Sequence, residues 1–439
     1  MIRCVEVLST AFDESRGSVT PEINPSDAIK VFEAFEAGRL DQLFSETNTE
    51  YYDHEGFESL RIGVGVPREA VWRLISAIRR STGLLVLESA WGDFQVRVTP
   101  TAQLMESLYD IDTWGARSLI GKTALPADEE WIVLDRLLVD EAVLIALAKT
   151  NAEEPTKAEI IETRTEVIAA IYDETTPPSD AGVVAARFYK TMRALPDAHS
   201  QSISPEYIMG VHRLLRDGEP DAGILRTTDN AADKGNATTP SARIMGELQA
   251  MHAYTESQDV PFVHPLVKSL ALAWWIRRVR PFEQYNYLVS RLVSMAFALR
   301  HGYRVSGIIE SGFQLREQPA ADDDLTGRFI HQLKIISHSK DLAEAELRLR
   351  VARFRSATER FSHLGINHRQ ALILDRALRK PDTTFTIKHH ARTRELAYET
   401  ARQDFIRLVD AGIMEQQKRG KAFEFRLAQG AEKRLNKPK

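Results

Sequence analysis

The chain has 439 residues, of which 43% are hydrophobic and 27% charged, and its formal net charge is −5. This composition is typical of a soluble protein with two or three domains, and it excludes a wholly basic nucleic-acid coat. The single cysteine, Cys4, excludes an intrachain disulfide and favours a reducing compartment. Because no apolar run reaches membrane-span length and the N-terminus lacks signal-peptide features, we expect a cytoplasmic protein without membrane contact.

The first hundred residues predict a small α+β region. One helical pattern covers residues 28–43 and a second covers 67–82. The largely apolar run 83–88 predicts one strand, and residues 94–98 alternate in polarity as a half-buried strand does. Residues 1–60 give no functional signal.

From residue 101 to residue 321 the pattern is helical. Helices are expected over 139–150, 181–195, 203–215 and 241–257, and from His264 to the loop at 280. Asp180 and Ser204 are predicted N-caps, and Pro205 fits the first helical position. His264 precedes a helix, and we interpret it as a structural cap rather than a catalyst.

A polar loop lies at residues 279–291, between two apolar helical runs, and the second helix would present free N–H groups to an anion. Its order of residues resembles the Fic-family signature HPFx(D/E)GNGRxxR. The matching positions are Pro281, Phe282, Asn286 and Arg291. The differing positions are Arg280 for the His, Gln284 for the acidic residue, Tyr285 and Tyr287 for the glycines, and Leu288 for the first Arg. The resemblance implies a mainly α Fic/Fido helical bundle and transfer of AMP from ATP onto a protein hydroxyl.

The differences remove the groups that this chemistry needs. Arg280 stays charged near neutral pH and cannot act as the base. Gln284 offers Mg²⁺ a neutral carbonyl instead of a carboxylate. Tyr285 and Tyr287 add bulk where a phosphate cradle needs glycine. We therefore interpret Gln284, Asn286 and Arg291 as a degenerate nucleotide loop with no cofactor and no metal; ATP with Mg²⁺ would bind only if the site is active. The alternative is that the loop was never a site.

Two further segments extend the resemblance. Residues 139–150 resemble the family's inhibitory helix, "DEAIASSxxEG", and Lys149 stands at the position of its inhibitory Glu. That resemblance implies that Lys149 would repel Arg291; the alternative is a plain buried helix. Residues 221–226 resemble the turn before the family's target-docking flap, so 227–239 is either that flap or a loop.

The remaining chain predicts linking helices and a winged helix-turn-helix. Residues 322–359 show helical spacing for one or two long helices. Beyond them we expect helices over 369–378, from Thr386 and over 398–409, a strand from Ile413, a hairpin tip at 417–421 and a strand over 423–427. The string from Tyr398 to Phe425 resembles a bacterial winged-helix pattern. The expected domains are thus 1–100, 101–321, 322–365 and 366–439, the last with a basic tail.

Basic residues concentrate in this last domain. The predicted DNA contacts are Thr400, Arg402, Lys418, Arg419 and Lys421. Other basic groups that could meet phosphates are Lys388, His389, His390, Arg392 and Arg394. The alternative is a winged helix used for dimerisation or for packing on the helical domain.

Three functions remain open from the sequence. The first is a pseudo-enzyme acting as a binding or regulatory module, with DNA binding through the winged helix. The second is a nucleotidyl- or phosphoryl-group transferase in which Arg280, Asn286 and Arg291 hold an altered donor. The third is a structural protein with a protein partner or a second copy of itself, as a homodimer.

Overall fold

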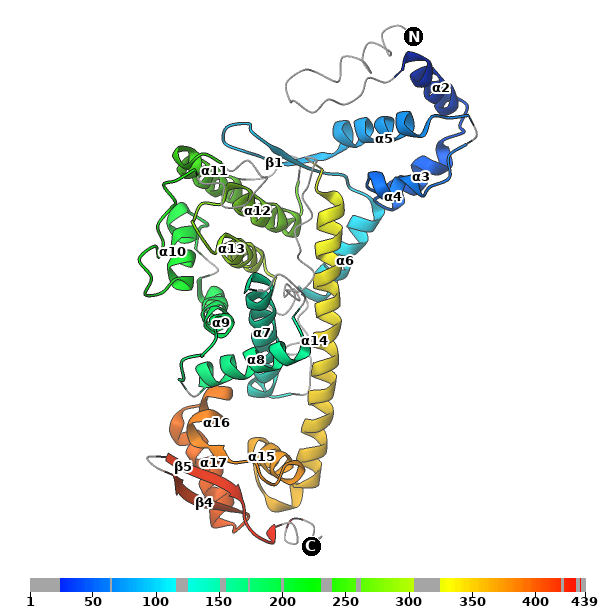
Figure 1. Ribbon diagram of the computed structural model, residues 1–439. Coiled ribbons are helices and arrows are strands. Elements are labelled where there is room, and N and C mark those ends of the chain that lie inside the picture. Colours follow the sequence, from blue (N-terminus) through cyan, green and yellow to red (C-terminus); the bar gives the residue numbers. More distant parts are fainter. Residues whose placement is uncertain are drawn as a thin grey trace. The chain divides into compact units, whose positions relative to one another are not determined.

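The computed structural model describes residues 24–63, 65–115, 125–150, 155–172, 174–198, 201–229, 239–257, 262–303, 324–419, 422–431 and 435. The chain forms two compact units: Met1–Tyr109 with Ser257–Ala271 and Gln318–Leu333, and Asp110–Glu256 with Leu272–Glu317 and Lys334–Lys439. The fold is mainly α, which confirms the expected class (Figure 1). Among the described residues, no helix combines the length and the apolar character needed to span a membrane.

The first unit begins with four helices around a small core. They are α2 (Pro25–Glu36), α3 (Asp41–Thr49), α4 (His54–Glu58) and α5 (Arg68–Thr82). The predicted single helix over 28–43 is wrong, because Gly38 takes a left-handed φ of 70° and ends α2. The N–H of Arg39 then returns to the carbonyl of Ala34 at 2.9 Å, which closes the helix end. Phe57 and Val71 are fully buried between these helices.

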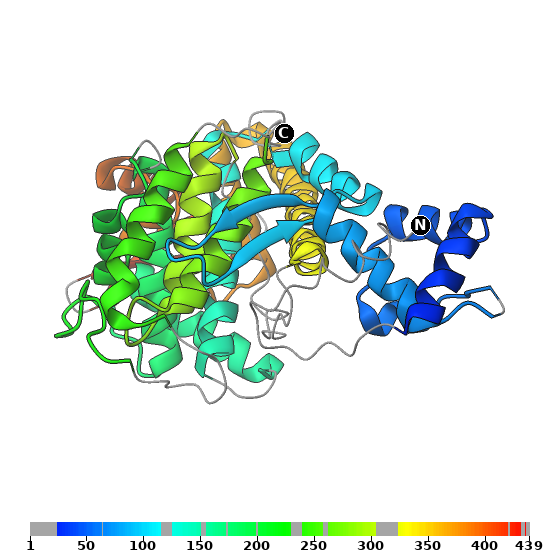
Figure 2. The ribbon, with the colours of Figure 1, turned by 90° about the horizontal axis from the view of Figure 1, so that it is seen from above.

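The two predicted strands form a hairpin in the same unit. β1 (Leu84–Glu88) pairs antiparallel with β2 (Gln95–Val98), with Leu84 opposite Val98, and the register shifts between Leu85 and Leu87. Figure 2 shows the two arrows side by side. The expected α+β character of the N-terminal region is therefore present.

The second unit contains a helical bundle, some of whose helices begin in the first unit. Its helices are α6 (Ala102–Gly115), α7 (Ala127–Thr150), α8 (Lys157–Tyr172), α9 (Asp180–Ala198), α10 (Pro205–Leu215), η1 (Ser241–Arg243), α11 (Ile244–Glu256), α12 (Pro265–Val279) and α13 (Asn286–Arg300). Every residue of α13 from Leu288 to Ala298 is buried. An all-round buried helix needs apolar neighbours on each side, and α9 and α10 both pack against it.

The predicted caps of these helices have different outcomes. The Ser204 side chain accepts from the N–H of Tyr207 at 3.2 Å, and Pro205 is the first residue of α10, as expected. Asp180 is already the first residue of α9, and its predicted capping role belongs to Ser179, whose hydroxyl accepts from the N–H of Gly182 at 2.9 Å. His264 Nδ1 accepts from the N–H of Leu266 at 3.3 Å, consistent with a structural cap of α12.

A single long helix leads to residues 366–431, which we call the C-terminal module. α14 (Thr326–Arg360) has 35 residues and is followed by η4 (Ser362–Leu364). The module consists of α15 (His368–Arg379), β3 (Phe385–Thr386), α16 (Ile387–Thr393), α17 (Tyr398–Asp410), β4 (Met414–Arg419) and β5 (Ala422–Leu427). Its antiparallel sheet has the order β3-β5-β4. The three helices and the hairpin follow one another in the order expected from the sequence, and β3 is an additional strand.

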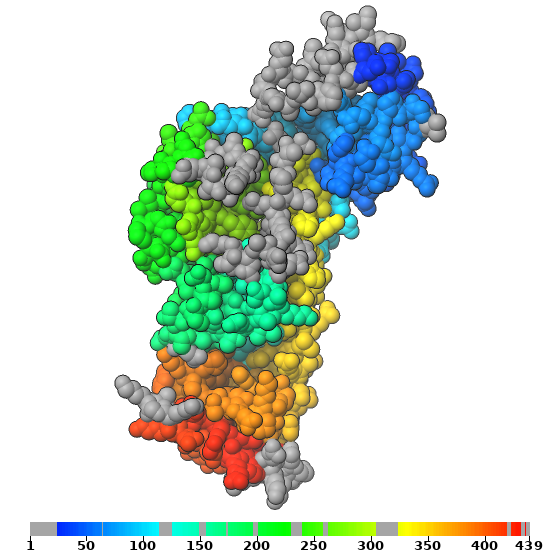
Figure 3. All heavy atoms as spheres, viewed as in Figure 1, coloured from blue at the N-terminus to red at the C-terminus, as the bar shows by residue number. Residues whose placement is uncertain are grey.

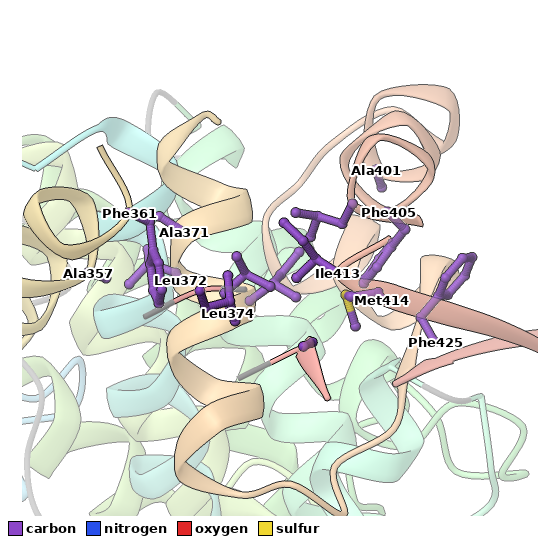
Figure 4. Close-up of a cluster of buried hydrophobic side chains, with 14 of the residues drawn as sticks. Ala357, Phe361, Ala371, Leu372, Leu374, Ala401, Phe405, Ile413, Met414 and Phe425 are labelled. Carbon is purple, nitrogen blue, oxygen red and sulfur yellow. The ribbon is translucent and has the colours of Figure 1, made fainter. Parts of the chain in front are cut away.

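The module has its own apolar core, where Phe405, Ile413, Met414 and Phe425 point toward one another (Figure 4). The rings of Phe405 and Phe425 stack with centroids 4.6 Å apart, and both are fully buried. The hairpin strands are longer than expected, because β4 continues to Arg419, opposite Ala422. Lys418 therefore lies within a strand rather than at the tip, and residues 420–421 lie outside the described residues.

Candidate functional site

The loop between α12 and α13 has a backbone shape that few side chains favour. Arg280 and Tyr285 take left-handed φ angles of 49° and 65° at its two ends. A non-glycine residue in this region costs about 1–2 kcal/mol, so the surroundings must hold it there. Tyr285 occupies a position where the family signature has glycine, and the backbone takes the shape that glycine would favour.

Asn286 closes the loop from the first position of α13. Its Oδ1 accepts from the N–H of Phe282 at 2.9 Å, and its Nδ2 donates to the carbonyl of Phe282 at 2.7 Å. Both polar groups of the Asn286 amide are thereby bonded to the main chain of Phe282. The Phe282 ring is buried beneath this closure.

Arg226 holds the same loop from the turn after α10. Its guanidinium donates to the carbonyls of Arg280 at 2.6 Å and Val279 at 3.2 Å, and its own N–H donates to the carbonyl of Pro281 at 2.9 Å. It also donates to the carbonyl of Thr228 at 2.8 Å, where the polar stretch begins. The sequence marked Arg226 only by its place in the resembling turn, and its role as a loop clamp was missed.

His212, on α10, is a histidine near the loop that the sequence analysis did not single out. Its Nδ1 accepts from the N–H of Gly223 at 3.0 Å, and its ring stacks on Phe282 with centroids 3.9 Å apart. Burial lowers the pKa of His212 to about 4, so the ring is neutral at pH 7. Because its side chain is fully buried, it cannot reach a substrate hydroxyl as a base.

The predicted nucleotide-binding arginine is engaged inside the protein. Arg291 lies on α13 and pairs with Glu141 of α7 at 3.3 Å, and both side chains are buried. Glu141 lies within the segment 139–150 that resembles the inhibitory helix, and its pairing with Arg291 was not expected from the sequence. The side chain of Lys149, the expected neighbour, lies outside the described residues.

The loop and the helix after it bring the predicted residues together, and two of them, Asn286 and Arg291, have partners inside the protein. Arg280, Gln284 and Asn286 lie within a seven-residue segment, and Arg291 follows on α13. Gln284 is exposed, Arg280 is half-buried, and Asn286 and Arg291 have the internal partners given above. The arrangement can hold a fixed loop shape, and it offers no carboxylate at Gln284 and no titrating base at Arg280.

The predicted DNA contacts lie on the C-terminal module. Thr400 is exposed near the start of α17, and Lys418 is exposed on β4. Arg402 donates to Glu399 at 3.0 Å, so a carboxylate lies beside it on α17. The side chain of Arg419 and the residue Lys421 lie outside the described residues.

Three of the other basic residues, Lys388 and Arg392 on α16 and Arg394 directly after it, form ion pairs with residues of the helical bundle. Lys388 pairs with Glu174 at 2.8 Å, and Arg392 pairs with the same carboxylate and donates to the carbonyl of Tyr172 at 2.8 Å. Arg394 pairs with Asp128 at 3.0 Å. The module lies directly against α8 and its neighbours in Figure 3.

One group of side chains in the described residues has the spacing of a metal site. Ligand atoms of Asp128, Glu129 and His368 lie within 4.8 Å of one another. Glu129 is already paired with both Arg394 and Arg350, whose positive charges oppose a further cation. We interpret this group as an ion-pair cluster between α7, α14 and the module.

No protein-family model matches the chain, and no curated protein matches it. Solved structures that are similar to it are Fic proteins, the family that the loop resembles. A Fic family protein from Desulfovibrio desulfuricans is 14% identical, with 77% of this chain and 98% of that chain covered and a TM-score of 0.46. A Fic domain containing signaling protein from Bacteroides thetaiotaomicron is 11% identical, covering 55% and 96%, with a TM-score of 0.41. Fic-1 from C. elegans is 14% identical, covering 80% and 94%, with a TM-score of 0.40.

Proposed function

We propose that this chain is a Fic-related protein without AMP-transfer activity, which acts as a binding module. The observation that carries the proposal is the buried pair between Arg291 and Glu141 at 3.3 Å. A nucleotide held by Arg291 would have to displace this carboxylate from a site without water access. Removing one partner from such a pair costs about 3–5 kcal/mol, which opposes nucleotide binding from the start.

The missing base and metal ligand reinforce the proposal. Loss of a general base lowers a rate by about 10²–10⁴-fold, and Arg280 cannot take a proton near pH 7. The neutral side chain of Gln284 attracts Mg²⁺ more weakly than a carboxylate does. Transfer would therefore lack a base and a metal ligand even if a nucleotide entered.

The proposed role of the C-terminal module is contact with protein, beginning with this chain's own helical bundle. Lys388 and Arg392 of α16, and Arg394 directly after it, form ion pairs within the chain. The groups left for an outside partner are on α17 and the hairpin, including exposed Thr400 and Lys418. DNA binding through those groups is the second candidate, since an exposed lysine on a wing is placed to meet a phosphate.

The test combines calorimetry with a transfer assay on the purified chain. With ATP and Mg²⁺ we expect no heat of binding that depends on Arg291, and no labelled AMP on the chain or on added proteins. Arg280→His should stay inactive, because Tyr285, Tyr287 and Gln284 remain. Arg407→Ala, an exposed change on α17, is the control. Labelling that is abolished by Arg280→Ala or Asn286→Ala would show an active transferase with altered chemistry.

A further inference from the structure

A cavity of about 380 Å³ lies between α14, α15, β3 and α16. Its polar lining consists of Arg350, Arg353, Arg376, Arg379, Thr384, Thr386, His389, His390, Thr393 and Arg394. Its apolar lining consists of Ile132, Leu372, Ile373 and Phe385. The volume lies within the range of about 300–1,000 Å³ that small-molecule sites occupy.

The charge of this lining is strongly one-sided. Five arginines line the cavity, and no carboxylate does. Arg350 and Arg394 share Glu129, and Arg379 pairs with Asp375 at 2.7 Å. Arg353 and Arg376 have no carboxylate partner in the part of the chain that the structure describes. Positive potential in a concave, partly apolar site concentrates anions.

Arg350 adds a second observation that points to a ligand. Its Nε is buried and has no hydrogen-bond partner among the described residues. A buried donor without a partner costs about 1–3 kcal/mol, and a bound anion would supply the missing acceptor. Burial lowers the pKa of Arg350, and the nearby guanidiniums of Arg394 and Arg353 lower it further, although Glu129 opposes them. An anion in the cavity would relieve this repulsion.

We propose that the cavity binds a small phosphorylated molecule of nucleotide size. Its phosphate would meet Arg353 and Arg376, because guanidinium groups match phosphate geometry and stay charged. Its flat apolar part would lie on Leu372, Ile373 and Phe385. The site belongs to the seam between the C-terminal module and the helical bundle, and it is separate from the loop before α13 and from any transfer reaction there.

The test uses the full chain with three probes, pyrophosphate, AMP and ATP, in the absence of Mg²⁺. Calorimetry and thermal shift should report saturable binding, tighter for AMP or ATP than for pyrophosphate if the apolar wall contributes. The double variant Arg353→Ala/Arg376→Ala should weaken binding about tenfold or more, since a hydrogen bond to a charged group contributes about 1.5–3 kcal/mol. Both residues are exposed at the rim, so the fold should persist.

The matched control is Arg355→Ala/Arg407→Ala, which removes two exposed arginines from α14 and α17 that do not line the cavity. Affinity unchanged in this control and reduced in the rim variant supports the proposal. Nucleotide binding that is lost in Asn286→Ala and kept in the rim variant would locate the ligand at the loop and overturn it. No response to any probe at millimolar concentration, or a response only to a DNA duplex, would also overturn it.

Discussion

At the scale of single residues, the pair of Glu141 and Arg291 decides how the loop helix is held. Both side chains are buried, so removing the carboxylate leaves a buried guanidinium without its counter-charge. We expect Glu141→Ala to lower the free energy of unfolding by about 3–5 kcal/mol in urea titrations. Glu162→Ala, an exposed change on α8, should stay within about 0.5 kcal/mol. Equal effects of the two changes would contradict the importance of the buried pair.

The left-handed φ of 65° at Tyr285 gives a second residue-scale prediction. Tyr285→Gly and Tyr285→Val both remove the ring and its contact with Arg216, whose guanidinium lies 5.0 Å from the ring centroid. The difference in free energy of unfolding between the two variants therefore reports the cost of the left-handed backbone conformation. We expect the glycine variant to be the more stable by about 2 kcal/mol, because a β-branched residue is strongly disfavoured there.

The same pair of changes at Tyr287 is the control for this measurement. Tyr287 is the second residue of α13 and is not among the described non-glycine residues with positive φ. In a helix, glycine is less favourable than valine by a few tenths of a kcal/mol. The order of the two variants should therefore invert between Tyr285 and Tyr287, as measured by urea unfolding.

His212 gives a prediction about pH. Its folded pKa is lowered to about 4 by burial, below the unfolded value of about 6.5. The unfolded chain therefore binds more protons, and the stabilisation is present above pH 6.5 and is lost as the pH falls toward 4. We expect this loss to reach about 2–3 kcal/mol from His212 alone.

The measurement is the free energy of unfolding against pH for the parent and for His212→Asn. Asparagine keeps an acceptor near the N–H of Gly223 and does not titrate, so the slope between pH 6.5 and 4 should flatten. His363→Asn, at an exposed position in η4, should leave the slope unchanged. A slope that is the same in all three proteins would contradict the assignment.

At the scale of elements, Asp404 on α17 connects the helices of the C-terminal module. It accepts from Arg369 at 2.7 Å, from Asn367 at 2.8 Å and from His390 at 3.2 Å. Burial opposes its ionisation, but these hydrogen bonds outweigh burial and hold the pKa of Asp404 well below its ordinary value. The stabilisation is therefore present above the unfolded pKa of about 4 and is lost below it.

We expect Asp404→Ala to destabilise the module by about 3 kcal/mol, because it leaves the half-buried guanidinium of Arg369 and the buried imidazole of His390 without their carboxylate. Hydrogen exchange of the backbone amides in α15, α16 and α17 is the measurement, and their protection should fall together. Asp410→Ala, at the exposed end of α17, is the control. Loss of protection confined to α17 would contradict a role in connecting the helices.

Element positions followed from the sequence wherever local signals were strong. The predicted helix 67–82 is Arg68–Thr82, and the expected helix 398–409 is Tyr398–Asp410. The failure at Gly38 came from a glycine inside an otherwise helical pattern, whose left-handed closure depends on the returning N–H of Arg39. The length of β4 is set by its pairing with β5, and the local sequence of β4 carries no signal of that pairing.

The site was less accessible to sequence reasoning, because its contacts are long-range. Arg291 and Glu141 are 150 positions apart, and Arg226 reaches main-chain carbonyls 53 and 54 positions away. Nothing local to Arg226 or His212 distinguishes a loop clamp from an ordinary helix-end residue. The residues of the loop itself were identifiable, whereas their engagement with internal partners was not.

At the scale of the whole molecule, ion pairs of very different exposure join the C-terminal module to the helical bundle. Glu129 is fully buried and is shared by Arg350 and Arg394, while Glu174 is 62% exposed and is shared by Lys388 and Arg392. Exposed pairs contribute about 0–1 kcal/mol, whereas breaking a buried pair costs about 3–5 kcal/mol. The stability of the contact between the module and the helical bundle should therefore depend mainly on Glu129.

We expect Glu129→Ala to expose the seam, with a loss of several kcal/mol in unfolding free energy and faster hydrogen exchange in both α7 and α16. Glu174→Ala should change either measurement little. This pair of variants supplies its own comparison, since both remove one carboxylate that is shared by two cations. A larger effect from Glu174→Ala would mean that the surface pairs hold the module.

The clamp made by Arg226 and Asn286 has one more consequence. Its hydrogen bonds to the loop end on main-chain carbonyls and N–H groups, which every amino acid other than proline provides in full. Glu283 and Gln284 are exposed between these anchors, where the Glu283 carboxylate accepts from the hydroxyl of Thr228 at 2.9 Å and neither side chain belongs to the clamp. We therefore expect both positions to tolerate substitution while the turn keeps its form. A library randomised at residues 283 and 284 should therefore yield mostly folded variants. The turn is then a suitable position for inserting a short foreign peptide.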